Sequence, residues 1–254
     1  MKCILSQDVK INLEEQASPF NQTKFIFDAN GCFVASGSIL KKSSFSDAID
    51  ETTGSEPWVS DDSDYWRFDE NDNISSLVLK LPNVNLENTN NIVLPEVSKY
   101  FSSVKLESNK KSFVAPPQKF RHFNPAERYL LSTSVESNEL LGLTRIKINN
   151  HLSFLMDVKN YFSGWVVENP LSIITDDIGG SIDEATPDSF TYKVFAEFFE
   201  VVSNNKCEQM DDDMEEVVKL LSNVINEEKL QKIKGSLREK LLVSSIENLK
   251  NYFL

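Results

Sequence analysis

The chain has 254 residues, and its 39 acidic and 26 basic side chains give a formal net charge of −13. This charge disfavours general binding to nucleic acids or anionic membranes, because both depend mainly on Lys and Arg. A chain of this length can bury a sizeable core as one large domain or two small ones. Its three cysteines, Cys3, Cys32 and Cys207, are too widely spaced for a disulfide framework or a CxxC metal site, and we expect reduced thiols.

The N-terminal residues predict a first β-strand, at Cys3–Leu5 or at Val9–Leu13, where Val9, Ile11 and Leu13 alternate with polar residues. They lack the apolar run of a signal peptide. The sequence also contains no stretch of the ~18 apolar residues that a membrane-spanning helix needs. We therefore expect a cytoplasmic protein that is not embedded in a membrane.

Two copies of one pattern predict two sister β-hairpins in one sheet. In Thr23–Leu40, apolar residues alternate on both sides of Asp28-Ala29-Asn30-Gly31, and Asn-Gly in this position is the strongest short-range hairpin signal. The same aromatic-x-Phe-Asp-x-Asn pattern returns at Trp66–Asn71, which predicts a second hairpin over Tyr65–Leu81. Asp69-x-Asn71-x-Asn73 resembles the start of a calcium loop, but Ile74 and Lys80 replace the Gly and Glu that such a loop requires. We therefore predict a polar turn at these residues.

The segment Ser43–Asp64, here called the acidic loop, joins the two hairpins. It has seven carboxylates, no Lys or Arg, and the breakers Gly54 and Pro57, so we predict a loop with a short helix near Phe45–Ile49. Aromatic rings among carboxylates suit the recognition of a basic surface, because rings supply contact area and charges steer association. The predicted partner-binding residues are Trp58, Asp61, Asp62, Asp64, Tyr65 and Trp66. The alternation of Trp66 with Phe68 equally fits a Trp66 that faces the core.

The middle of the chain predicts further short strands separated by Asn-rich turns. They are expected at Ile92–Leu94, Tyr100–Leu106, Tyr129–Thr133, Leu143–Ile148, Leu152–Val158, Trp165–Val167 and Leu171–Ile174. Asn149-Asn150 predicts a tight turn. Residues 105–128 are locally basic and aromatic, a composition that suits phosphate or nucleic acid. The alternative is that this segment balances the negative charge of the acidic loop and that its Lys residues protect strand edges from pairing. The net charge of the protein favours this alternative.

The last quarter of the chain predicts helices. Thr186 followed by Pro187 is a helix-start signal, and Phe190, Val194, Phe195 and Phe198 follow at helical spacing. Further runs of apolar residues at helical spacing follow, and Gly235 either breaks or bends the third predicted helix. The predicted fold is therefore α+β: a mainly antiparallel sheet of β-hairpins in residues ~1–175, then three or four amphipathic helices. We expect a β-rich region over 1–185 and a helical region over 186–254, packed on the sheet as one α+β unit.

The usual catalytic patterns are absent from the sequence. His122 and His151 have no Cys, Asp or Glu at metal-ligand spacing, and no GxSxG, GxxxxGK[ST] or GxGxxG occurs. Asp157-Val158-Lys159 and Glu227-Glu228-Lys229 have the D/E-x-K form of some nucleases, a tripeptide that is common by chance. The sequence therefore predicts no catalytic residue, no metal site and no cofactor.

These observations favour a non-enzymatic, acidic binding protein that docks on or neutralises another macromolecule. The expected partner is a protein with a basic surface, such as a toxin or a nuclease, and the analogy is to immunity proteins and inhibitors as a class. One alternative is an enzyme, a hydrolase or nuclease, whose site is assembled from scattered residues. Another is a structural or assembly component. The sequence leaves the oligomeric state open.

Overall fold

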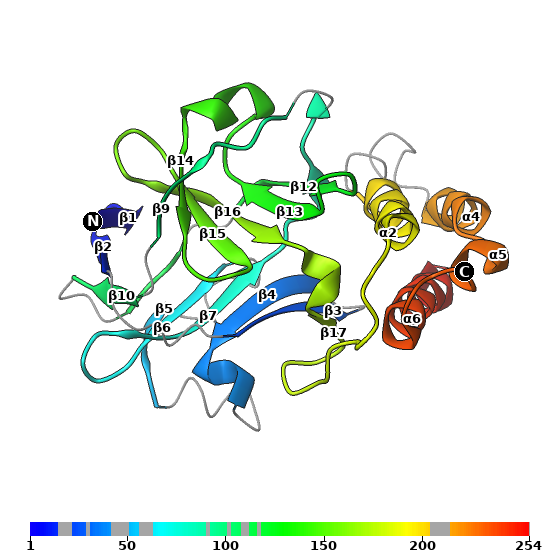
Figure 1. Ribbon diagram of the computed structural model, residues 1–254, viewed down its shortest axis with the longest axis horizontal. Helices are drawn as coiled ribbons and strands as arrows, with labels where there is room; N and C mark the ends of the chain where they lie inside the picture. The colour runs from blue at the N-terminus through cyan, green and yellow to red at the C-terminus, as the bar shows by residue number, and fades with distance from the viewer. Residues whose placement is uncertain are drawn as a thin grey trace.

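The computed structural model describes residues 1–14, 22–28, 31–41, 51–55, 63–89, 92–100, 103–107, 112–115, 118–203 and 214–253. Two seven-stranded sheets and a three-stranded sheet are followed by C-terminal helices. Figure 1 shows the helices gathered at one side of the molecule, beyond the ends of β12 and β3. The strands come first in the chain and pair mainly in antiparallel fashion, so the predicted α+β fold is confirmed.

The two predicted hairpins form the centre of the first seven-stranded sheet. β3 (Thr23–Asp28) pairs with β4 (Gly31–Gly37), β6 (Tyr65–Phe68) pairs with β7 (Ile74–Lys80), and β4 lies antiparallel to β7. The prediction of sister hairpins in one sheet is therefore confirmed, although Ala29 and Asn30 of the first turn lie outside the described residues. In the second turn, Asp69 Oδ1 accepts the backbone N–H groups of Asn71 and Asn73 at 2.9 Å, as a polar turn requires.

The edges of this sheet are short strands. The order is β11-β5-β6-β7-β4-β3-β17, so the edge strands are β11 (Ser112–Phe113) and β17 (Ile174–Thr175), and β5 (Thr53–Ser55) lies between β11 and β6. β5 lies inside the acidic loop, so the prediction of an unpaired loop over this whole segment was wrong. The cause is Gly54, whose φ is +143° and where a Cβ would stand 1.9 Å from the carbonyl oxygen of Trp66, so that only glycine lets the two strands pair. The predicted helix near Phe45–Ile49 lies outside the described residues.

The second seven-stranded sheet has the order β8-β12-β13-β16-β15-β14-β9. Its strands are β8 (Val84–Asn85), β9 (Val97–Tyr100), β12 (Phe120–Asn124), β13 (Tyr129–Thr133), β14 (Thr144–Lys147), β15 (Leu152–Met156) and β16 (Phe162–Glu168). The predicted strands at 129–133, 143–148, 152–158 and 165–167 are confirmed to within a few residues. Asn149 turns the chain between β14 and β15, because its side-chain oxygen accepts the N–H groups of His151 and Leu152 at 2.9 Å.

Three strand predictions need correction. Ile92–Leu94 is not a strand, and Pro95, which has no N–H to give to a ladder, follows it directly. The strand expected over Tyr100–Leu106 is two strands in different sheets, β9 and β10 (Ser103–Leu106). Of Leu171–Ile174, only Ile174 enters a strand, since residues 170–172 form a 3-10 turn. The remaining sheet pairs β1 (Lys2–Ser6) and β10 with β2 (Val9–Glu14), so both candidate first strands exist.

Four helices follow in the described part of the chain, in agreement with the three or four expected. They are α2 (Ser189–Val201), α4 (Met214–Val224), α5 (Glu227–Leu230) and α6 (Ser236–Phe253). The N-cap of the first is Asp188, not the predicted Thr186, because the Asp188 carboxylate accepts the Thr191 N–H at 2.8 Å. Gly235, with φ +105°, separates α5 from α6. Among the described residues, no helix is long and apolar enough to cross a membrane.

One large apolar core joins these parts. Trp66 of the first sheet packs against Phe154 and Phe162 of the second, with ring centroids 5.2 and 5.1 Å apart. Phe27 of β3 packs against Phe195 of α2 at 5.4 Å, so the helices bury their apolar faces on the sheets. The boundary expected between residues 185 and 186 stays a prediction.

Candidate functional site

The structure describes three of the six predicted partner-binding residues, Asp64, Tyr65 and Trp66, and all three are buried. Trp58, Asp61 and Asp62 lie outside the described residues. Asp64 and Trp66 have 0% of their surface exposed and Tyr65 has 9%, because both faces of β6 are covered. Trp66 faces the core between the sheets, and Tyr65 belongs to a second apolar cluster on the opposite face. A partner cannot reach Asp64 or Trp66 in this structure, so docking through the acidic loop stays a prediction for Trp58, Asp61 and Asp62 alone.

Asp64 is a buried carboxyl group. Its Oδ1 accepts the N–H of Lys80 at 2.9 Å, while Oδ2 is buried without a hydrogen-bond partner. Burial raises the pKa of this group to about 8, and the Lys80 N–H and ammonium counteract only part of the effect. The protonated form is therefore favoured in the folded protein at neutral pH.

We expect Asp64→Asn to flatten the dependence of stability on pH. Between the ordinary pKa of 3.8 and the folded pKa of about 8, the folded state holds a proton that the unfolded state has lost. The free energy of unfolding therefore falls as pH rises through this window, by up to about 1.4 kcal/mol per pH unit for this group. Asn keeps the acceptor for the Lys80 N–H and cannot ionise, so the variant should be more stable by roughly 1–3 kcal/mol at pH 8 once the unpaired amide donors are counted.

Urea unfolding at pH 5, 6, 7 and 8 measures this difference. Glu70→Gln is the matched control, since it removes a carboxylate that is exposed in the second hairpin turn. Parallel pH profiles for the wild type and Asp64→Asn would contradict the prediction.

The two histidines and Cys3 are partly or fully buried. Burial lowers the pKa of His122 to about 4, and its Nε2 has no hydrogen-bond partner. The second histidine, His151, directs Nδ1 at the carbonyl oxygen of Glu168 at 3.0 Å. Burial, with the charge of Asp157, raises the pKa of the Cys3 thiol to about 12. Within the described residues, no group of three or more His, Cys, Asp or Glu side chains could hold a metal ion.

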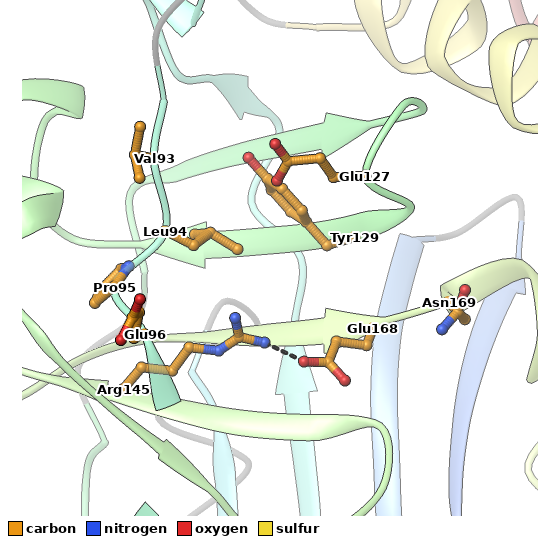
Figure 2. A pocket seen from close by; sticks show the side chains of 9 residues that line it. All are labelled: Val93, Leu94, Pro95, Glu96, Glu127, Tyr129, Arg145, Glu168 and Asn169. Carbon is orange, nitrogen blue, oxygen red and sulfur yellow. Dashed lines mark hydrogen bonds and ion pairs between the residues drawn. The ribbon is translucent and has the colours of Figure 1, made fainter. Parts of the chain in front are cut away.

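A polar pocket of about 420 Å³ lies on the outer face of the second seven-stranded sheet. In Figure 2, Tyr129, Arg145 and Glu168 form its floor, from β13, β14 and β16, and residues 93–96 form the opposite wall. We call this hollow the sheet pocket, and its lining residues are Val93, Leu94, Pro95, Glu96, Glu127, Tyr129, Arg145, Glu168 and Asn169. Its volume lies in the range of about 300–1,000 Å³ that is typical of ligand sites.

The charges of the sheet pocket are only partly compensated. Arg145 Nη2 donates to Glu168 Oε1 at 2.5 Å, and Lys147 donates to the other oxygen of the same carboxylate. Glu168 is therefore held between two cations. The carboxylates of Glu96 and Glu127 are on exposed residues and form no ion pair with any described residue. With Lys147 included, these five charges sum to −1, and Glu96 and Glu127, the two carboxylates without an ion pair in the described part, lie beside an apolar wall.

The other residues that line the sheet pocket combine apolar surface with polar groups. This combination suits a partner side chain that is apolar along its length and polar at its tip. Leu94 extends from the wall toward Tyr129 (Figure 2), and Val93 is 59% exposed at the rim. Burial raises the pKa of Tyr129, so its hydroxyl stays protonated at neutral pH. Arg145 Nε is buried without a hydrogen-bond partner, which leaves an N–H donor beneath the pocket floor.

No family model, curated protein or solved structure matches the chain. The functional argument therefore rests on the chemistry of these residues. None of them was predicted, because they come from separate segments at 93–96, 127–129, 145 and 168–169. The available signal was Arg145 with Lys147: two cations two residues apart share one face of a strand, and a carboxylate must lie near them if that face is covered.

The locally basic segment 105–128 is largely structural where it is described. Arg121 donates to the side-chain oxygen of Asn85 and to the carbonyl oxygens of Phe199 and Val202 at the end of α2. Its guanidinium therefore neutralises a helix C-terminus inside the protein. Phe123 packs against Phe199 at 5.3 Å. Lys110 and Lys111 lie outside the described residues. These contacts favour the structural interpretation over nucleic-acid binding for Arg121 and Phe123.

Proposed function

We propose that this protein is a non-enzymatic binding protein that docks on a basic surface of a partner protein, and that the sheet pocket receives a basic side chain of that partner. The observation that carries the proposal is the pair of carboxylates Glu96 and Glu127, which form no ion pair with any described residue and line a pocket with an apolar wall. The finer form of the proposal is an inhibitor of the immunity-protein kind, acting on a basic enzyme such as a toxin or nuclease in the cytoplasm.

The pocket matches the two parts of an Arg or Lys side chain. The methylene stem lies on Leu94, Pro95 and the ring of Tyr129, where it removes apolar surface from water. The charged head then reaches Glu96 or Glu127 at the pocket edge. Because Arg145 and Lys147 are already engaged by Glu168, they repel an incoming cation less than free cations would.

The overall charge supports the same class of partner. A protein of net charge −13 attracts basic surfaces and associates with them faster than a neutral protein would. The field of the whole molecule supplies this attraction, and the pocket supplies a specific contact for one side chain. The two contributions are separable by experiment.

We expect Glu96→Lys combined with Glu127→Lys to weaken binding of a fluorescein-labelled Arg-rich nonapeptide by at least about tenfold, or ~1.4 kcal/mol. The physical reason is that two charge reversals replace attraction at the pocket by repulsion. Fluorescence anisotropy at physiological salt measures the dissociation constant. The matched control is Glu70→Lys with Glu87→Lys, which makes the same change in net charge at exposed residues that do not line the pocket.

The control decides what the weakening means. A much larger loss in the pocket variant supports the proposal. Equal losses in both variants would show that only net charge matters, and the sheet pocket would then not be the binding site. Unchanged binding in the pocket variant has the same consequence.

A further inference from the structure

A second hollow lies between the last three helices. α4 ends at Val224 and α5 follows at Glu227, and both face α6 (Figure 1) across a groove of about 480 Å³. We call it the α4–α6 groove. Its apolar lining is Ile225, Leu230, Val243 and Ile246, and its charged lining is Glu227, Glu239, Glu247 and Lys250. None of these residues lines the sheet pocket.

The groove runs along one face of α6. The α6 residues that line it are Glu239, Val243, Ile246, Glu247 and Lys250. Glu239, Val243, Ile246 and Lys250 follow one another at spacings of three or four residues. Glu247 lies four residues after Val243 and next to Ile246, so the five positions share one broad face of the helix. From Glu239 to Lys250 the face extends roughly 16 Å, or about three helical turns. An elongated occupant therefore fits the groove better than a compact one.

The edge of the groove is acidic, and its carboxylates are free of ion pairs with the described residues. Three carboxylates face a single ammonium group, that of Lys250. Glu227, Glu239 and Glu247 form no ion pair with any described residue, whereas the neighbouring Glu228 is paired with Lys232 at 2.6 Å. A cationic occupant is attracted to this edge, and an anionic one is repelled.

The charge of the α4–α6 groove indicates which kind of molecule would bind there. A second copy of this chain carries the same net charge of −13, and an anionic membrane is repelled by the same three carboxylates. A helix with apolar residues every three to four positions and Lys or Arg beside them matches both the apolar lining and the acidic edge. We propose that the α4–α6 groove binds a basic amphipathic helix of a partner protein.

The test uses the full chain and a fluorescein-labelled helical peptide of about 18 residues made of Leu and Lys. The length is chosen because isolated helices shorter than ~12–15 residues are marginal in water. The matched peptide has Glu in place of Lys. We expect the Leu/Lys peptide to bind and the Leu/Glu peptide to bind at least about tenfold more weakly in fluorescence anisotropy.

Two variants of the chain separate the groove from general charge attraction. Glu239→Gln with Glu247→Gln should weaken the Leu/Lys peptide by at least about tenfold, while Glu70→Gln with Glu87→Gln should change the dissociation constant less than about twofold. Val243→Glu blocks the apolar lining and at the same time adds a negative charge. Binding in the groove predicts that this variant binds more weakly, and general attraction predicts that it binds more tightly.

Circular dichroism of each variant establishes that the helices are retained. Tighter binding by Val243→Glu, equal effects of the two double Gln variants, or no binding of the Leu/Lys peptide to the folded wild type would each overturn the proposal. The inference is independent of the sheet pocket: Glu96→Lys with Glu127→Lys should leave the selectivity for the Leu/Lys peptide intact. The double variant Glu239→Gln, Glu247→Gln should likewise bind the Arg-rich nonapeptide with the same dissociation constant as the Glu70→Gln, Glu87→Gln control.

Discussion

Trp66→Ala is expected to lower the free energy of unfolding by about 3–5 kcal/mol, the usual cost of removing a large aromatic side chain from a core. Trp66 is fully buried on β6 and contacts Phe154 and Phe162 across the space between the two seven-stranded sheets. Alanine leaves a cavity at this contact, because the sheets are held by their own hydrogen bonds and cannot close it. The loss therefore combines transfer free energy with lost packing.

Urea unfolding of the variant and the wild type at one pH measures this effect. Tyr100→Ala is the control, since Tyr100 is 72% exposed on the edge strand β9 and its loss should cost less than about 0.5 kcal/mol. The experiment also separates the two interpretations of Trp66 that the sequence leaves open. A Trp66→Ala protein of wild-type stability with impaired partner binding would place Trp66 on a docking surface and contradict the structure.

Arg238→Met is also expected to lower the free energy of unfolding by about 3–5 kcal/mol, here for an electrostatic reason. Arg238 is fully buried on α6, and its guanidinium donates to the carbonyl oxygens of Leu171 at 2.8 Å and Ala185 at 2.7 Å. The Asp183 carboxylate lies 3.7 Å from it and also accepts the Leu237 N–H at 3.1 Å. Methionine fills much of the volume but removes the donor to the carbonyl oxygens of Leu171 and Ala185 and the cation beside Asp183, and buried polar groups that lose their partners are costly.

The position of Arg238 predicts which part of the protein the Arg238→Met substitution destabilises most. Its hydrogen bonds tie α6 to residues 171–185, the segment that leads from the sheets to the helices. Amide hydrogen exchange should therefore accelerate along α6 more than in β13 or β16. Lys232→Met is the control, because it removes only an exposed ion pair with Glu228 and should cost far less than Arg238→Met. Equal losses for the two variants would show that Arg238 is not a structural tie.

Local patterns were sufficient to predict the hairpins and the helices. The alternation in TKFIFD and the Asp69 turn depend on neighbouring residues, and both appear in the structure as predicted. The helix start was misplaced by two residues, since Thr186 and Asp188 are both good N-caps and only the Asp188 side chain meets the Thr191 N–H. The short strand β5 escaped prediction because its partner β6 lies beyond a segment without periodicity.

The sequence alone predicts the fold class, the order of strands before helices, the paired hairpins and the acidic character of the chain. Each of these follows from residue type and spacing within a short window. The burial of Trp66 and Asp64 is seen only in the folded protein, because burial depends on which faces of a strand are covered by distant segments. The same holds for the sheet pocket and the α4–α6 groove, whose walls come from separate elements and exist only once the sheets and helices have packed.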